Sequence, residues 1–180
     1  MANKTLHVND PLPGFQNLHG TDGKRYSDKD FAGKNILVIV FSCNHCPYVQ
    51  AYEDRMIAIQ QDYNANGVQL VAINSNETKN YPEDNFDEMV KRAKQRGFNF
   101  PYLRDEDQSV AELFGATHTP EFFVFDRSQK LRYHGKMDDD WKNPEAVKNN
   151  YLRNALDELL AGKEVKVPET HSIGCTIKWR

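Results

Sequence analysis

The sequence has little cysteine and no long apolar run. Three cysteines in 180 residues are too few, and odd in number, for the disulfide framework of a small secreted protein. No stretch approaches the ~20 apolar residues of a membrane span, and the amino-terminal residues lack the apolar segment of a signal peptide. These absences predict a cytoplasmic protein with no membrane partner. In that reducing compartment, a close cysteine pair is more often catalytic or metal-binding than structural.

An excess of basic charge is absent as well. The 23 Lys and Arg residues are interleaved with 26 Asp and Glu residues, for a net charge of −3. Nucleic acid is therefore not an expected partner. The chain also lacks internal repeats and a linker rich in Pro, Gly or Ser. We predict a single domain over residues 1–180, with its core at about 8–160 and a carboxyl-terminal tail, 163–180, docked on that core.

The order of apolar patterns predicts an α/β fold. A turn at residues 20–23 indicates a β-hairpin near the start, and the unbroken apolar run 36–41 indicates a strand buried on both faces. Further strands are expected at 68–73, 101–103, 121–125 and 131–134. Helices are expected from about residue 44–46 to 66, from Asn85 to Gly97, through 110–114, and from Asn143 to Gly162. Strands alternating with helices favour a central sheet with helices on both faces.

A pair of thiols marks the first junction between strand and helix, in the sequence Phe-Ser-Cys-Asn-His-Cys-Pro. The free amide hydrogens and the dipole of a helix amino terminus favour an anion, so a cysteine there ionises more easily. We expect Cys43 to be the exposed and more acidic nucleophile, and Cys46 to resolve the mixed disulfide. His45 adds a donor, and positive charge when protonated, beside the thiolate. The competing interpretations are half of a metal site and a peroxide-reducing cysteine.

Strand, Cys-x-x-Cys and helix, followed by Thr119-Pro120 ahead of another strand, resemble the thioredoxin superfamily. The resemblance implies a thioredoxin-like fold with a central mixed sheet, helices on both faces and an amino-terminal hairpin extension. It also implies that Pro120 is a cis-proline beside the first cysteine, and that Thr119 and His118 belong to a substrate-binding edge. The hairpin and the region between residues 74 and 97 are similar to the redoxin branch, which includes peroxiredoxins.

The resemblance implies a thiol–disulfide oxidoreductase whose catalytic residues are Cys43, His45, Cys46 and Pro120. Its partners are then protein or small-molecule thiols and disulfides, and its redox-active disulfide needs no cofactor. Two alternatives stay open: a thiol-dependent peroxidase, and a copper- or zinc-binding protein of the same fold without turnover. A structural zinc site needs four ligands, and the sequence has no second cysteine pair, so no metal site is assigned.

The sequence departs from the resembling families at two points. Thioredoxins carry a buried carboxylate on the strand before the first cysteine, but residues 36–41 of this chain are wholly apolar. Candidate proton acceptors for Cys46 are then Glu77, Glu121 and His45. Peroxiredoxins have a hydroxyl three residues before the peroxide-reducing cysteine. The corresponding residues of this chain are Val40 and Cys43, so efficient peroxide reduction is not expected.

The tail holds the third cysteine. Ile173, Cys175 and Ile177 alternate with polar or small residues, which predicts an extended segment with one buried face. Either Cys175 is an unpaired thiol in a docked tail or it is a third redox cysteine that reaches the Cys43 pair. We predict that the tail folds back onto the domain near the Cys43 pair.

Overall fold

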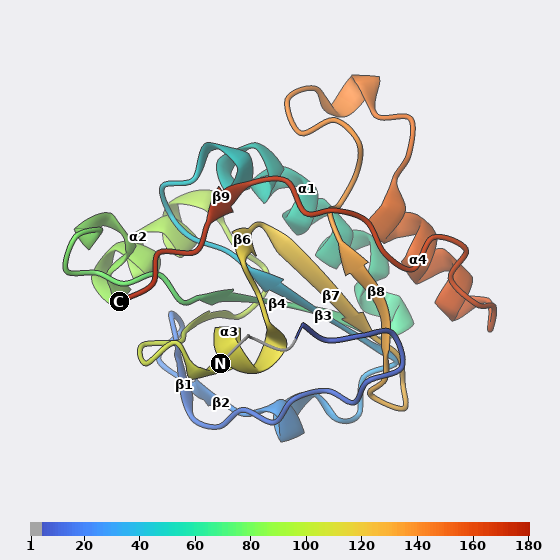
Figure 1. Ribbon diagram of the computed structural model, residues 1–180, viewed down its shortest axis with the longest axis horizontal. Helices are drawn as coiled ribbons and strands as arrows, with labels where there is room; N and C mark the ends of the chain where they lie inside the picture. Colours follow the sequence, from blue (N-terminus) through green and yellow to red (C-terminus); the bar gives the residue numbers. More distant parts are fainter. Residues whose placement is uncertain (1–4) are drawn as a thin grey trace.

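The computed structural model describes residues 5–180 (Figure 1). Residues 1–4 of the predicted domain, and that part of the signal-peptide expectation, lie outside the described residues. Among residues 5–180, no helix combines the length and the apolar character needed to cross a membrane.

A mixed sheet of seven strands forms the centre of the molecule. Its strands, in spatial order, are β2 (Arg25–Tyr26), β1 (Leu18–Gly20), β5 (Tyr102–Arg104), β4 (Val68–Asn74), β3 (Ile36–Phe41), β7 (Glu121–Phe125) and β8 (Leu131–Gly135). The β3–β4 and β4–β5 pairs are parallel, whereas β7 runs antiparallel to β3. The amino-terminal hairpin β1–β2 joins the sheet through β5. The expected thioredoxin-like α/β fold is confirmed.

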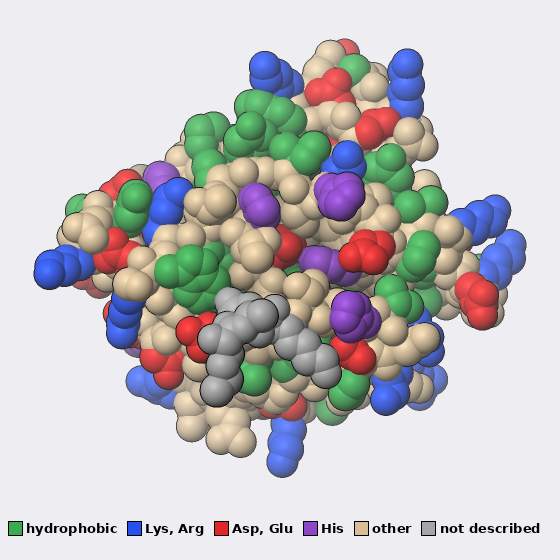
Figure 2. All heavy atoms as spheres, viewed as in Figure 1, with side chains coloured by type: hydrophobic (Ala, Val, Ile, Leu, Met, Phe, Trp, Pro, Cys, Tyr) green, Lys and Arg blue, Asp and Glu red, His purple; other side chains and the backbone are tan. Residues whose placement is uncertain are grey.

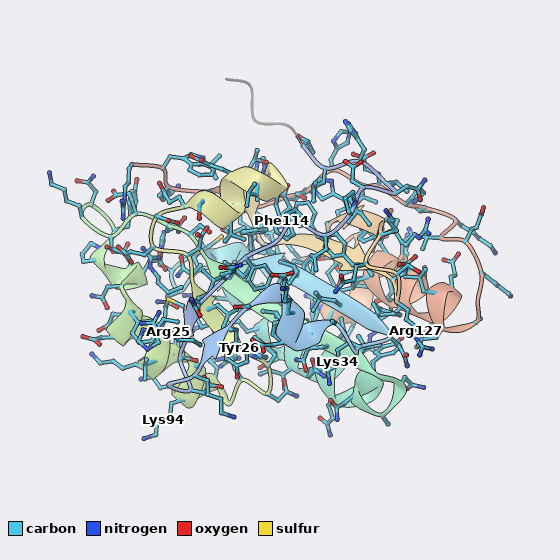
Figure 3. The ribbon with its side chains drawn as sticks, turned by 90° about the horizontal axis from the view of Figure 1, so that it is seen from below. Arg25, Tyr26, Lys34, Lys94, Phe114 and Arg127 are labelled. Carbon is cyan, nitrogen blue, oxygen red and sulfur yellow. The ribbon has the colours of Figure 1, made fainter. Side chains whose placement is uncertain are left out.

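Helices cover both faces of the sheet, as the strand pattern requires. Helices α1 (Pro47–Tyr63), α2 (Phe86–Arg96) and α4 (Tyr151–Leu160) pack on one face, together with both cysteines of the pair. Helix α3 (Ser109–Phe114) packs on the other. In Figure 3, Phe114 points from α3 toward the sheet, while Arg25, Lys94 and Arg127 point outward. The alternation of side chains along β3 supplies apolar groups to both cores.

Two helix starts differ from the prediction. Helix α1 begins at Pro47, after an extended Cys46 at its cap, because proline fits the first turn, where its missing amide hydrogen has no partner to lose. Helix α4 begins at Tyr151, not at Asn143. Asn143 caps only a short 3-10 turn, and the carboxylate of Asp139 then accepts the amide hydrogens of Lys148 and Asn149, which holds that segment out of the helix.

The tail runs past the start of α1 and beside β6 (Figure 1). Its short strand β9 (Cys175–Thr176) pairs antiparallel with β6 (His118–Thr119). Ile177 follows, donates its amide hydrogen to the Thr117 carbonyl at 2.9 Å, and buries its side chain. Thr119 and Cys175, 56 positions apart in the sequence, therefore lie side by side.

Candidate active site

The two paired cysteines lie at the junction of β3 and α1, and both are buried. Cys43 is 2% exposed and Cys46 is fully enclosed. The apolar strand ends at Phe41, the turn follows, and Cys46 caps the helix. The helix amino terminus therefore acts on Cys46 and not on Cys43, because its first free amide hydrogens follow the capping residue.

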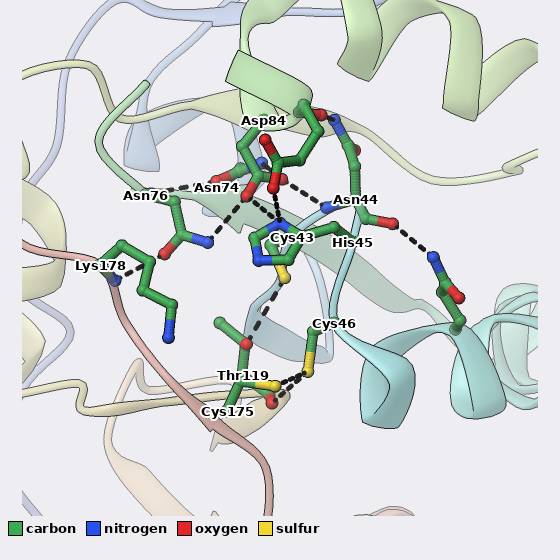
Figure 4. Close-up of polar contacts among 12 residues, drawn as sticks. Cys43, Asn44, His45, Cys46, Asn74, Asn76, Asp84, Thr119, Cys175 and Lys178 are labelled. Atoms are coloured by element: carbon green, nitrogen blue, oxygen red, sulfur yellow. Dashed lines mark hydrogen bonds and ion pairs between the residues drawn. The ribbon is translucent and has the colours of Figure 1, made fainter. Parts of the chain in front are cut away.

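Two groups contact the sulfur of Cys46. It lies 2.8 Å from the Cys175 Sγ and 3.4 Å from the Thr119 carbonyl oxygen (Figure 4). Hydrogen bonds from the Cys43 thiol, the Cys175 thiol and the backbone of Val49 and Cys175 outweigh burial and lower the pKa of Cys46 to about 4. These contacts favour the thiolate form of Cys46 over the thiolate form of Cys43.

Cys43 has the opposite character. Its hydrogen bond to Cys46, its burial and the nearby charge of Asp84 raise its pKa above the usual thiol range. The expected exposure of Cys43 is wrong, because both cysteines are buried, while its greater acidity stays a prediction that the surroundings of the pair do not favour. The helix starts after Cys46, so the amide hydrogens that stabilise a thiolate reach the second cysteine, while the carboxylate of Asp84 disfavours a second anion at the first.

A buried carboxylate organises the turn that carries Cys43. Asp84 is completely buried and accepts hydrogen bonds from the Asn44 amide (2.7 Å) and from the side chains of Asn74 (3.2 Å) and Asn76 (3.0 Å). Its second oxygen lies 2.5 Å from the Nδ1 of His45. The ligand-type atoms of Cys43, His45 and Asp84 all lie within 4.8 Å of one another. The site thus brings together a thiol, an imidazole and a carboxylate.

His45 is held on two sides. Asp84 binds its Nδ1, and the Tyr81 ring stacks on the imidazole with centroids 5.9 Å apart. His45 is partly exposed, and its side chain stands beside Cys43 instead of pointing freely into solvent.

The Thr119-Pro120 segment contacts the cysteines as the resemblance implies. Its peptide bond is cis. The Thr119 hydroxyl lies 3.6 Å from the Cys43 Sγ, and its carbonyl oxygen faces Cys46. The backbone of Thr119 pairs with Cys175, while the ring of His118 turns to the hydroxyl of its neighbour Thr117 at 2.8 Å.

The carboxylates proposed from the sequence as proton acceptors do not serve Cys46. Glu77 binds the amides of Lys79 and Asn80 in its own loop. Glu121 lies on β7 with its side chain toward Thr117 and His134. Sequence reasoning missed Asp84, which sits just before the Asn85 helix cap, where an acidic residue resembles an ordinary helix-start group.

Cys175 completes the cluster from the tail. All three cysteines are reduced in the structure. Burial, the hydrogen bond to Cys46 and the charge of that thiolate raise the pKa of Cys175 to about 11, with Lys178 opposing the shift. Figure 2 shows the same side of the molecule as Figure 1, where histidine side chains lie in the middle with acidic side chains beside them and most Lys and Arg stand at the rim.

The fold and the paired thiols define a thioredoxin-like protein with a Cys-x-x-Cys site. The Redoxin family model matches residues 7–152, and the chain belongs to that family. This membership confirms the resemblance and the predicted oxidoreductase class.

Several relatives are similar to this chain. An uncharacterized conserved protein from Geobacillus kaustophilus is 40% identical, with a TM-score of 0.91 over 97% of this chain and 93% of that one. A hypothetical protein from Sinorhizobium meliloti 1021 is 35% identical, with a TM-score of 0.90 over 98% and 97%. The thiol-disulfide oxidoreductase ResA of Geobacillus thermodenitrificans is 25% identical over 127 residues, 69% of this chain and 67% of ResA. ResA of Bacillus subtilis is 28% identical over 116 residues, 63% of this chain and 59% of that relative.

Proposed function

We propose that the protein is a thiol–disulfide oxidoreductase that exchanges electrons through a Cys43–Cys46 disulfide. One observation carries this proposal: both sulfurs of the Cys-x-x-Cys motif lie against Thr119, with the Cys43 Sγ 3.6 Å from its hydroxyl and the Cys46 Sγ 3.4 Å from its carbonyl oxygen. A stabilised thiolate beside a neutral thiol is the arrangement that disulfide exchange needs, because one sulfur attacks and the other resolves.

The exchange conserves atoms and electrons. The Cys46 thiolate attacks one sulfur of a substrate disulfide, and the other substrate sulfur leaves as a thiolate. Cys43 then loses its proton and attacks the Cys46 sulfur of the mixed disulfide. The second substrate thiolate departs, the Cys43–Cys46 disulfide forms, and two electrons have passed to the substrate. His45, bound to Asp84 and within 4.8 Å of Cys43, is the proposed acceptor of the Cys43 proton.

This order of attack reverses the one expected from the sequence. The thiolate is the nucleophile in disulfide exchange, and the lowered pKa of Cys46 beside the raised pKa of Cys43 supports the assignment of this role to Cys46. Protein or small-molecule disulfides are the proposed substrates, with the Thr119 backbone as the edge that binds an extended chain. His118, next to Thr119 on the same strand, is proposed to contact such a chain from the side.

Trapping of mixed disulfides tests both the activity and the order. We expect Cys43→Ser in a Cys175→Ser background to retain substrate covalently on Cys46, because neither neighbouring thiol is left to resolve the intermediate. The matched control is Cys46→Ser in the same background. The probe is oxidised glutathione, and adducts are located by mass spectrometry.

Retention in the Cys43→Ser variant supports initial attack by Cys46. Retention in the Cys46→Ser control instead would assign the attack to Cys43 and reverse the order. A wild-type protein that neither forms the Cys43–Cys46 disulfide nor exchanges with glutathione would refute the oxidoreductase itself.

Soft-metal binding is a second candidate, supported by the close approach of Cys43, His45 and Asp84. It is the weaker one, because the Asp84 oxygens already accept hydrogen bonds from three asparagines and bind His45. Titration of the reduced protein with Cu(I) and Zn(II) distinguishes the two. Stoichiometric binding that disappears in His45→Ala would favour the metal function. The cytoplasmic location and the absence of a cofactor, a nucleic-acid partner or a membrane partner stay predictions.

A further inference from the structure

The tail places a third sulfur beside Cys46 with unusual closeness. The Cys46 and Cys175 Sγ atoms are 2.8 Å apart, against roughly 2.03–2.05 Å in a disulfide bond. Thr119, whose backbone pairs with Cys175, also places its carbonyl oxygen 3.4 Å from the Cys46 Sγ. The two residues are therefore aligned through both main chain and side chain.

The alignment is built by the tail's backbone and does not rest on one contact. Cys175 pairs with Thr119 in an antiparallel register, and Gly174 lies so close that an added Cβ would stand 2.0 Å from the Thr119 carbonyl oxygen. No side chain can fit at that position without moving one of the two segments. A glycine directly before the cysteine lets the tail approach the edge that, in the proposed function, binds substrate.

Beyond the cysteine, further bonds anchor the tail on the loops around the site. The Lys178 carbonyl accepts from the Glu77 amide and the Gln108 side chain, each at 2.8 Å. The Lys178 amide donates to the Asn76 side chain at 2.9 Å, and the Arg180 amide donates to Gln108 at 3.1 Å. Asn76 also binds Asp84, so the tail is tied to the carboxylate beside His45.

We propose that Cys46 forms a second, alternative disulfide with Cys175, which fastens the tail over the Thr119 edge as a redox latch. The inference rests on the proposed function only for the source of the oxidising disulfide. In the latched state the substrate edge is occupied by the chain's own strand β9, and Cys43 is a free thiol. The tail thus takes the place of an extended substrate that presents a cysteine.

The latch closes by an isomerisation that needs no further oxidant. Once exchange has produced the Cys43–Cys46 disulfide, Cys175 loses its proton and attacks the Cys46 sulfur. The Cys46–Cys175 bond forms, the Cys43–Cys46 bond breaks, and Cys43 leaves as a thiolate that takes up a proton. No electrons are gained or lost, and an external dithiol reopens the latch by reducing the new bond.

Cys46, and not Cys43, is the partner of the tail cysteine. Cys46 is the group whose hydrogen bond and charge raise the pKa of Cys175. The Cys43 sulfur instead contacts the Thr119 hydroxyl and lies near the Asp84 side of the turn. Cys46 is therefore the shared member of two mutually exclusive disulfides.

Disulfide mapping after oxidation with diamide tests the latch on the full chain. Diamide takes up two electrons and two protons for each disulfide formed. Trypsin releases Cys43 and Cys46 together on residues 35–55 and Cys175 on residues 167–178. The Cys43–Cys46 disulfide gives peptide 35–55 short of two hydrogens, and the latch gives the two peptides joined.

We expect Cys43→Ser to yield the joined peptides in most molecules, Cys175→Ser to yield only the internal disulfide, and Cys46→Ser to yield neither. Failure of Cys43→Ser to join the peptides, while Cys175→Ser closes its internal disulfide, overturns the latch and leaves the proposed function standing. The converse pattern leaves the latch standing and refutes the Cys43–Cys46 couple. Joined peptides in Cys46→Ser would also overturn the latch, because the pairing would not be specific.

Two further readouts keep the outcome decisive. Circular dichroism establishes that each variant is folded. If Cys43→Ser does not fold, the wild-type protein is oxidised over a series of diamide concentrations, and samples are quenched in acid before digestion. Joined peptides in that series support the latch, and their absence at every concentration overturns it.

Discussion

Ile177 is the apolar anchor of the tail, and its truncation should expose Cys46. The side chain is 3% exposed and belongs to the same buried cluster as Phe114 and Phe123. Cys46 is fully enclosed, and we expect that a reagent reaches it when the tail opens. The alkylation rate of Cys46 in the reduced protein then reports the free energy of that local opening.

The size of the effect follows from the burial of Ile177. Replacing a buried isoleucine by alanine typically destabilises by about 2–5 kcal/mol, and the lower end applies to a tail at the surface, where neighbours relax into the space. If the loss falls on the docked tail, a change of about 2–3 kcal/mol raises the open population roughly 30- to 150-fold, at a factor of ten per ~1.4 kcal/mol. We expect Ile177→Ala to accelerate alkylation by that amount.

The assay is iodoacetamide labelling at pH 7, with sites located by mass spectrometry of the peptide carrying both paired cysteines. Ile173→Ala is the matched control, because Ile173 lies on the same tail but is 47% exposed. Its labelling rate should stay within about twofold of wild type, since surface substitutions usually change stability by less than ~0.5 kcal/mol. Equal rates for Ile177→Ala and wild type would refute the idea that the tail encloses Cys46. Equal acceleration by both substitutions would show that the effect is not specific to the buried anchor.

Three further predictions concern the chemistry of the pair. The thiolate absorbance of reduced protein should persist at pH 6 and vanish as pH falls through about 4, the pKa of Cys46, and Cys46→Ser should lack this step. That pKa lies below the value of about 8.5 for an unfolded cysteine. The contribution of Cys46 to the free energy of unfolding is therefore complete above pH ~8.5 and is lost as the pH falls toward 4. Urea unfolding at a series of pH values measures this loss. His45→Pro should lower the reduction potential of the Cys43–Cys46 pair by on the order of 30 mV, which corresponds to roughly 1.4 kcal/mol. Equilibration with glutathione measures this potential. An unchanged or higher potential would contradict the role of His45. The rate of hydrogen peroxide turnover should be on the order of 10²–10³-fold below that of a dedicated peroxidase, because Val40 and Cys43 offer no hydroxyl to bind the peroxide. The size of this loss is taken by analogy from the removal of a positioned hydrogen-bond donor in another enzyme. A rate typical of dedicated peroxidases would contradict this prediction.

Local patterns in the sequence predicted most of the fold. The apolar run 36–41 became the central strand β3, and the Asn85 cap and Gly97 enclose α2 as expected. These features depend on neighbours in the chain, such as the amide of Glu88, which donates to the Asn85 side chain. Patterns of this kind also indicated the Cys-x-x-Cys motif at the end of a strand and the Thr119-Pro120 segment that lies against it.

Relations between distant segments needed the tertiary structure. The sequence placed Cys43 and Cys46 on one turn, but which of them carries the charge depends on the exact helix start and on Asp84, which reaches the turn from another loop. Asp84 looks like an ordinary acidic residue in the sequence because its partners come from separate segments.

The same holds for the tail. Alternation predicted an extended strand, but its register against Thr119, and the contact between Cys46 and Cys175, arise only when both segments are folded onto one edge. The sequence by itself therefore determined the elements and the kind of chemistry, since both follow from residues close together in the chain. The tertiary structure decided which groups surround each sulfur of the pair and which sulfur stands beside Cys46, because electrostatic and hydrogen-bond effects depend on distances in space and not on separation along the chain.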